Sequence, residues 1–110
     1  MKKSSFGLHC PVAMTLESVG DPWCLLIVRD ALMGVSRFKS FERNLKISKN
    51  ILSNRLDTLI VHGVLEKRNS VDSPWPEYHL TQKGRELAPV IIELGKWGAT
   101  WNPPRKNKTT

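Results

Sequence analysis

The sequence predicts a mainly α-helical domain that carries one small antiparallel β-hairpin. Apolar residues recur at helical spacing between residues 11 and 62 and again from 89 to 101, whereas a period of two appears only between residues 65 and 80. Prolines and glycines mark the ends of these segments, where helices begin and end. With 110 residues, 40% of them hydrophobic, the chain has enough material for one core. We therefore expect a single small domain.

The first two predicted helices each begin at a proline. Residues 11–19 form the first, because a proline suits the first helical position and Gly20 ends the run. Asp21 is a good N-cap for the second helix, which runs toward Gly34. This second helix is apolar enough to be mostly buried.

The next two helices have the spacing of a helix-turn-helix. Ser36 is expected to cap the third, in which three apolar residues between Phe38 and Leu45 recur at i, i+3 and i+7. After a short turn, Ser48 should cap a fourth helix that ends at Gly63. The inner stripe of this helix is aliphatic and consists of Leu52, Leu56, Leu59 and Ile60.

Two short strands and a loop are predicted after the fourth helix. The strands lie near residues 65–69 and Glu77–Leu80, and the prolines between them stiffen a protruding loop. Trp75 in this loop either packs back on the domain or contacts a sugar-phosphate backbone. Thr81 should cap a short turn, and Pro89 should begin a separate final helix.

The final helix carries two apolar stripes, although one would satisfy the core of a monomer. Small residues within the second stripe allow a close approach, which predicts that a second copy of the chain packs there. The first helix is the expected companion. The predicted dimer interface comprises Val12, Leu16, Val19, Ile91, Ile92, Leu94, Gly95, Trp97, Gly98, Ala99 and Trp101.

The positive charge of the chain is concentrated in its middle. Seventeen Lys and Arg against ten Asp and Glu give a net charge of +7. Residues 37–68 alone carry eight basic and three acidic side chains, net +5, whereas residues 1–36 are neutral and residues 69–100 carry −1. This distribution indicates a surface that binds a polyanion. A merely solvated basic face is the alternative that charge alone leaves open.

The outer side of the fourth helix supplies polar groups that suit the major groove of DNA. Its first two turns carry short or flexible donors and acceptors and no Glu, and the start of the second helix of a helix-turn-helix enters the groove. An ordinary surface helix is the alternative.

The predicted contacts with DNA fall into three groups. We expect Lys49, Asn50, Ser53 and Asn54 to read bases. Arg37, Lys39, Ser48 and Arg55 are expected at phosphates, with a structural ion pair as the alternative for Arg55. Arg68, Ser73 and Trp75 are expected to meet the flanking DNA.

In this order and spacing, the chain resembles the HxlR family of bacterial and archaeal regulators over about residues 9–101. The matching strings include Cys10-Pro11-Val12, Arg37-Phe38, Ile47-Ser48, Gly63-Val64-Leu65, Tyr78-His79-Leu80-Thr81 and Trp97-Gly98. The resemblance implies a winged helix-turn-helix homodimer that binds palindromic promoter DNA. We do not expect an enzyme, and repression is the expected effect on transcription because the regulator is compact and has no separate ligand domain. Asp21-Pro22 stands where the family usually has Gly-Lys, so a phosphate contact there is not expected.

The two cysteines are expected to have different roles. Cys10, as the N-cap of the first helix, faces the positive end of the helix dipole, which favours a reactive thiolate. The resemblance adds that some family members sense electrophiles or oxidants through this cysteine. An unreactive thiol at the dimer interface is the alternative. Cys24 lies in an apolar helix and is expected in the core.

No cofactor or metal is expected from the sequence. The three histidines and two cysteines lack the spacing of metal ligands, and no pattern of nucleophile, base and orienting group supports a thiol enzyme. A winged helix that binds another protein instead of double-stranded DNA is the remaining alternative, and it predicts little dependence on salt.

The expected organisation is a flexible arm over residues 1–8, the domain over residues 9–101 and a basic disordered tail over residues 102–110. The longest apolar run, Trp23–Val28, has six residues, whereas a membrane-spanning helix needs about 20. We therefore expect a cytoplasmic protein with no membrane partner.

Overall fold

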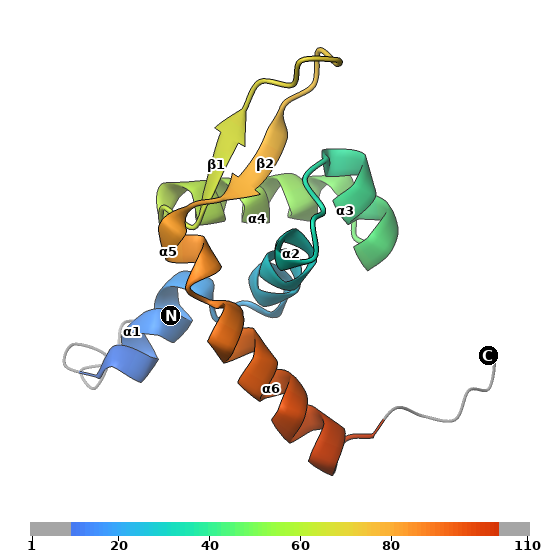
Figure 1. The fold of residues 1–110 in the computed structure, drawn as a ribbon. Helices are drawn as coiled ribbons and strands as arrows, with labels where there is room; N and C mark the ends of the chain where they lie inside the picture. Colours follow the sequence, from blue (N-terminus) through green and yellow to red (C-terminus); the bar gives the residue numbers. More distant parts are fainter. Residues whose placement is uncertain (1–9, 104–110) are drawn as a thin grey trace.

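The computed structural model describes residues 10–103 and confirms the mainly α fold with one antiparallel hairpin, a winged helix-turn-helix (Figure 1). Its elements in chain order are α1 (Pro11–Val19), α2 (Pro22–Leu32), α3 (Phe38–Leu45), α4 (Lys49–Val61), β1 (Leu65–Arg68), β2 (Glu77–Leu80), α5 (Gln82–Arg85) and α6 (Ala88–Trp101). The predicted N-terminal arm and all but the first two residues of the predicted tail lie outside the described residues.

Four helices begin at the N-caps that the sequence predicts, which are Cys10 for α1, Asp21 for α2, Ser48 for α4 and Thr81 for α5. The carboxylate of Asp21 accepts hydrogen bonds from two backbone N–H groups of α2, at 3.0 and 3.2 Å. The hydroxyl of Ser48 accepts one from α4 at 3.2 Å, and that of Thr81 accepts one from α5 at 3.0 Å. Each cap satisfies N–H groups that have no partner within the helix. α6 is a separate helix with Pro89 in its first turn, as predicted.

The predicted cap of α3 is wrong. Arg37, not Ser36, is the N-cap residue, and its side chain makes no capping hydrogen bond. The backbone explains the difference, because the carbonyl oxygen of Ser36 accepts a hydrogen bond from the N–H of Tyr78 at 2.8 Å and Arg37 forms an isolated antiparallel bridge with Glu77. The chain before α3 therefore extends along β2 and begins its helix only afterwards.

The core lies where α2, α3, α4 and the hairpin meet. Leu52, Leu56 and Leu59 of α4 are at most 1% exposed, and they pack with Phe41 of α3 and Ile27 of α2, both fully buried. Each such side chain contributes about 1.5–3 kcal/mol relative to its exposed state. These contacts hold α4 along its inner side and leave its outer side to solvent.

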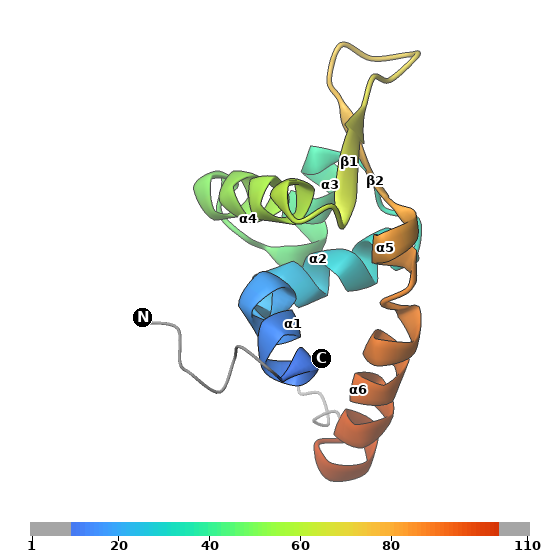
Figure 2. The same ribbon diagram turned by 90° about the vertical axis from the view of Figure 1, so that its left-hand side faces the viewer.

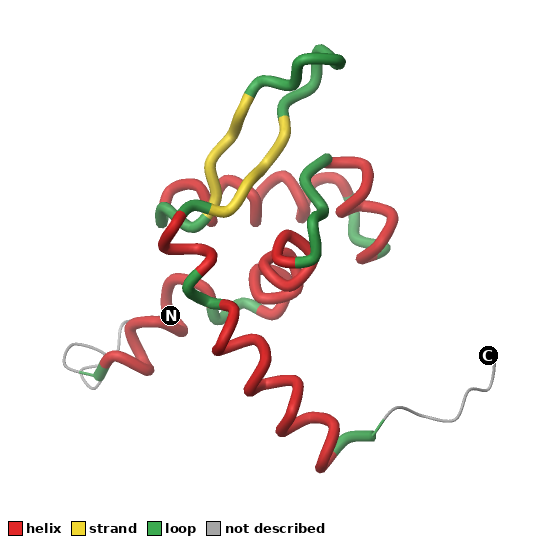
Figure 3. Tube along the Cα trace, viewed as in Figure 1, coloured by secondary structure: helices red, strands yellow, loops and turns green. Residues whose placement is uncertain are grey.

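The hairpin projects from this core as a wing. Leu65 pairs with Leu80 at its base and Arg68 with Glu77 at its outer end, and the connecting loop extends beyond the strands (Figure 3). Gly63, with a φ of +73°, makes the left-handed turn from α4 into β1. Gly84 of α5 packs so tightly that a Cβ atom there would meet the carbonyl oxygen of Val64.

α6 leaves the core instead of covering it. The wing and α6 extend in opposite directions from the body formed by α2, α3 and α4 (Figure 2). Within residues 10–103, no single helix is long and apolar enough to cross a bilayer, and α1 and α2 reach that length only when taken together across an 83° bend.

Candidate nucleic-acid interface

The outer side of α4 presents the four side chains that are predicted to read bases. Lys49, Asn50, Ser53 and Asn54 are all exposed, and they lie in the first two turns of a helix whose inner leucines are buried. Ile51, at 36% exposure, lies in the same turns. The sequence pattern did not single out Ile51, whose methyl groups suit contact with a thymine methyl group. Ile51 is accessible because of the orientation about its axis in which α4 packs against the core.

The amino group of Lys49 is held beside the turn between α3 and α4. Its Nζ lies 2.7 Å from the Glu42 carboxylate, and the Lys49 side chain is 69% exposed. A solvent-exposed pair of this kind contributes little net free energy. Lys49 can therefore exchange Glu42 for a phosphate or a base edge at small cost.

Arg55 forms the structural ion pair that the sequence left open as its alternative role. Its Nε lies 2.9 Å from Oδ2 of Asp21, which joins α4 to the start of α2. Partial burial acts to raise the pKa of Asp21, but hydrogen bonds from Arg55 and from the backbone of α2 outweigh it and lower that pKa. Nη1 of Arg55 also donates to Oδ1 of Asn54 at 3.0 Å. This contact uses the amide oxygen of exposed Asn54 and not its N–H donors.

Arg37 contacts the wing through three side chains, whereas its predicted contact with a phosphate stays a prediction. Its Nη2 lies 2.9 Å from Glu77 and 3.1 Å from Asp72, and it donates to Ser70 at 3.3 Å. Hydrogen bonding by His79 and the charge of Arg37 lower the pKa of Glu77. Hydrogen bonds from Ser70 and then Arg37 lower the pKa of Asp72. Two carboxylates therefore already compensate the charge of this guanidinium, and both contacts are made through Nη2.

Three cations of the helix-turn-helix are left without ion-pair partners in the described part of the chain. Lys39 was predicted as a phosphate contact, whereas Arg43 and Lys46 were not, although all three are exposed. Lys46 lies in the turn itself, with a φ of +53°. The position of that turn beside the start of α4 is the signal that could have identified Lys46.

The wing carries the remaining predicted contacts. Arg68 pairs with Glu66 at 2.6 Å, and both side chains are about half exposed. The hydroxyl of Ser73 accepts a hydrogen bond from the N–H of Trp75 at 3.1 Å, which fixes the loop locally. The Trp75 side chain is 71% exposed, so it does not join the core.

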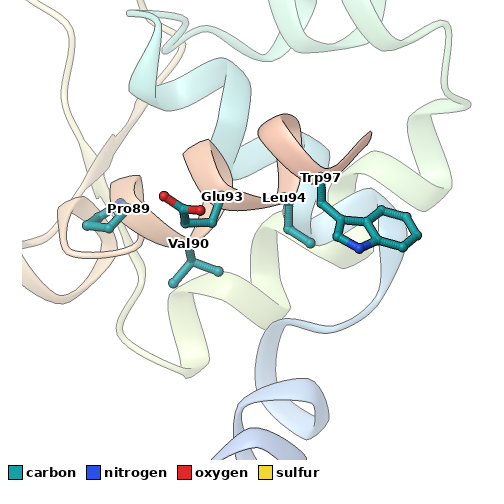
Figure 4. A pocket seen from close by; sticks show the side chains of 5 residues that line it. All are labelled: Pro89, Val90, Glu93, Leu94 and Trp97. Carbon is teal, nitrogen blue, oxygen red and sulfur yellow. The ribbon is translucent and has the colours of Figure 1, made fainter. Parts of the chain in front are cut away.

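A second surface, on α6 and α1, is apolar and uncovered. No residue of α6 is buried, and Val90, Leu94 and Trp97, at 44%, 52% and 63% exposure, lie along one side of it (Figure 4). One apolar stripe would have been enough for the core of a monomer, but α6 diverges from that core, and only Ile91 and neighbouring Leu87 pack against it.

The other predicted interface residues divide by burial. Val12 and Leu16 of α1 are exposed at 68% and 58%, and Met14, which was not predicted, is exposed at 52%. Val19 is 4% exposed and belongs to the core of the protomer, so it is not available to a second copy. Ile92 and Trp101 of α6 are also exposed. Gly95, Gly98 and Ala99 lie on the same uncovered helix, and a Cβ atom at either glycine would meet nothing within 4 Å.

The two thiols occupy different environments. Cys10 is the N-cap of α1, is partly exposed, and its Sγ lies 3.5 Å from the N–H of Ala13. Cys24 is 1% exposed, as predicted, and burial raises the pKa of its thiol to about 11. No cluster of three or more His, Cys, Asp or Glu side chains in residues 10–103 could hold a metal ion.

Known proteins similar to this chain are regulators of transcription. A family model described as HxlR-like helix-turn-helix matches residues 18–106. The HTH-type transcriptional regulator Rv3095 of Mycobacterium tuberculosis is 42% identical over 93 residues, which are 84% of this chain and 59% of that protein. The chain therefore spans about three-fifths of the length of this relative.

Solved structures share the fold at a similar level. The structure of PA1607 has a TM-score of 0.84 at 39% identity, over 93% of this chain and 71% of that one. The redox regulator HypR in its oxidized form has a TM-score of 0.74 at 30% identity, over 83% of this chain and 96% of that one. The similarity thus covers most of the helix-turn-helix, the wing and the flanking helices.

Proposed function

The chain belongs to the HxlR-like helix-turn-helix family of transcriptional regulators, and we propose that it acts as a homodimeric repressor on a pseudo-palindromic operator. The observation that carries this proposal is the outer side of α4. Its first two turns expose Lys49, Asn50, Ser53 and Asn54 on a helix whose inner side is fixed in the core. Asn and Lys side chains on such a helix can make paired hydrogen bonds to adenine and guanine.

The arrangement of the two surfaces supports a dimer. α6 and α1 lie on the side of the body opposite the wing (Figure 2), and both helices carry exposed hydrophobic side chains, so two copies can join through them while each keeps its wing free. Two recognition helices must lie about 34–36 Å apart to enter successive major grooves on one face of DNA. A compact repressor of this kind blocks transcription by occupying a promoter, and we place its action in the cytoplasm.

Binding to DNA at several salt concentrations tests the proposal. Fluorescence anisotropy would use labelled fragments from upstream of the protein's own gene and its neighbours, with a scrambled duplex for comparison. Specific binding should be about 10³-fold or more tighter than binding to the scrambled duplex and should weaken steeply with salt. Affinity that is independent of salt and sequence would contradict the proposal and favour a protein-binding module.

Matched lysine variants test the placement of α4. Lys49 and Lys96 are both about 70% exposed and both pair with a glutamate, but Lys96 lies on α6. Lys49→Ala should weaken operator binding by about 1–3 kcal/mol and relax base preference, because it removes a contact to DNA. Lys96→Ala should leave affinity almost unchanged. If both variants lost the same amount of operator affinity, the assignment of α4 to the DNA interface would be refuted.

Cys10 gives the regulator a candidate sensor. Its Sγ lies at the start of α1 beside the apolar interface surface and is partly exposed. Addition of the Cys10 thiol across a carbon–carbon double bond of a quinone would form an S–C bond beside that surface. The S–H and π bonds break, the thiol proton and the π electrons pass to the quinone, and the product is a hydroquinone thioether that would alter dimer geometry. Operator affinity measured before and after quinone treatment should change for the wild type and not for Cys10→Ser. A response that survives in Cys10→Ser would end this part of the proposal.

A further inference from the structure

A cavity of about 400 Å³ lies between the wing loop and the start of α3. Its lining comes from two segments far apart in the sequence, the first residues of α3 with the residue before them, and the loop together with the first half of β2. This volume falls within the range of 300–1,000 Å³ that is typical of small-molecule sites.

Carbon-rich side chains form most of the walls. Trp75, Phe38, Pro76 and Tyr78 line the cavity. Trp75 is 71% exposed, so much of its ring surface has no protein partner. Three rings and a proline favour a flat aromatic guest, because offset and edge-to-face contacts between rings add to simple burial of area. The hydrogen bond from the N–H of Trp75 to Ser73 holds the loop in its present shape.

The polar part of the lining carries an uncompensated positive charge. Arg37 is one of the two cations, but Glu77 and Asp72 already neutralise it at 2.9 and 3.1 Å. Lys39 is the other, and it has no carboxylate partner in residues 10–103. A guest with one negative charge would complete this balance, whereas an uncharged aromatic compound would leave the ammonium group unpaired.

We propose that this cavity binds a small aromatic carboxylate, with the ring beside Trp75 and Phe38 and the carboxylate at Lys39. The phosphate group of a DNA backbone has the right charge but no apolar face, so it would leave the aromatic walls uncovered. The cavity adjoins the wing and α3, so binding there would compete with DNA. This regulatory consequence depends on the function proposed above, whereas the binding itself does not.

Titration of the full chain without DNA tests the site directly. The probe is 2-naphthoate, followed by calorimetry and by amide shifts in nuclear magnetic resonance spectra. Uncharged 2-naphthamide and non-aromatic cyclohexanecarboxylate serve as comparison compounds. Saturable binding of 2-naphthoate should shift the amides of residues 37–39, 75, 77 and 78, and each comparison compound should bind at least fivefold more weakly. Equal binding of 2-naphthamide would overturn the recognition of a carboxylate, and shifts confined to α6 would overturn the location.

Two variants of α3 separate local charge from general charge. Lys39→Gln should weaken 2-naphthoate binding about fivefold, which is the effect expected of a partly exposed ion pair. Arg43→Gln is the matched control, because it removes an exposed, unpaired cation of the same helix outside the cavity, and it should bind the probe as the wild type does. If both variants lost the same affinity for 2-naphthoate, the probe would be attracted only to the general positive charge of the surface, and the proposed site in the cavity would be refuted.

The DNA measurement distinguishes failure of this inference from failure of the proposed function. Saturating 2-naphthoate should weaken operator binding, and the operator should weaken 2-naphthoate binding by the same factor. Salt-dependent operator binding without any binding of the probe would overturn the aromatic site and leave the regulator intact. Binding of the probe without any operator binding would support the aromatic site and refute the proposed action on an operator.

Discussion

Replacing Trp97 by alanine tests whether a second copy covers α6. Trp97 is 63% exposed in the protomer, at the centre of the apolar side of that helix. A tryptophan can bury up to about 250 Å², so about 160 Å² of Trp97 is still available to a partner. At about 25 cal/mol per Å², full burial of that area would contribute about 4 kcal/mol.

The expected effect on dimerisation is smaller than this limit but still large. Partial coverage and the ordering of side chains reduce the contribution to about 2 kcal/mol per protomer. A twofold interface contains the residue twice, so the variant should lose about 4 kcal/mol, or about a thousandfold in the dimer dissociation constant.

Sedimentation velocity over a range of protein concentrations measures this constant. Trp75→Ala is the matched control, because Trp75 is 71% exposed but lies on the wing, away from α6. The wild type and Trp75→Ala should sediment as dimers at micromolar concentration, and Trp97→Ala should sediment as a monomer with unchanged far-UV circular dichroism. A monomeric wild type, or equal dimer constants for the two tryptophan variants, would refute the assignment of α6 to the interface.

Three further predictions concern the fold and its thiols. Gly84→Ala should lower the urea midpoint by an amount equivalent to about 1–3 kcal/mol, because its Cβ would meet the carbonyl oxygen of Val64, and an unchanged midpoint would show that α5 shifts freely. The lowered pKa of Asp21 stabilises the fold above the unfolded pKa of about 3.9, and this contribution is lost as pH falls through the folded value. Asp21→Asn should therefore be less stable than the wild type at pH 7 in urea unfolding. This difference in stability should begin to shrink below about pH 4 and should disappear as the pH falls through the folded pKa; a difference independent of pH would contradict this. Iodoacetamide at pH 7.5 should label partly exposed Cys10 in the native protein and should label Cys24 only after unfolding, as read by mass spectrometry, since Cys24 is buried and its pKa is raised to about 11. Labelling of both thiols at equal rates would show that α2 opens readily.

Local signals predicted the helices and the face of α4 correctly. Asp21, Ser48 and Thr81 cap helices through atoms two or three residues away, so the sequence within one turn determines each start. The leucines of α4 alternate with its polar residues at a helical period, which fixes the buried and exposed sides together. Ser36 failed as a cap because a backbone hydrogen bond to the N–H of Tyr78, distant in sequence, took its place.

The roles of charged side chains could not be predicted in the same way. Arg37 is 40 residues from Glu77, and Arg55 is 34 residues from Asp21. A sequence shows that such cations exist but not which carboxylates meet them, because an ion pair depends on the relative placement of two elements. Two of the side chains predicted at phosphates, Arg37 and Arg55, form ion pairs within the chain, and their contact with DNA stays a prediction, while Arg43 and Lys46 are exposed and have no ion-pair partner among residues 10–103.

The sequence by itself determined the order of elements, the family and the polar side of α4, because these depend on periodicity, caps and spacing along the chain. Only the tertiary structure decided that α6 diverges from its own core, that Val19 is buried, and that Lys39 and Trp75 share one cavity. Each of these depends on how two elements pack. The direction of a helix axis and the contacts of a side chain 30 or 40 residues away are set by the sum of all core contacts, which no local segment contains.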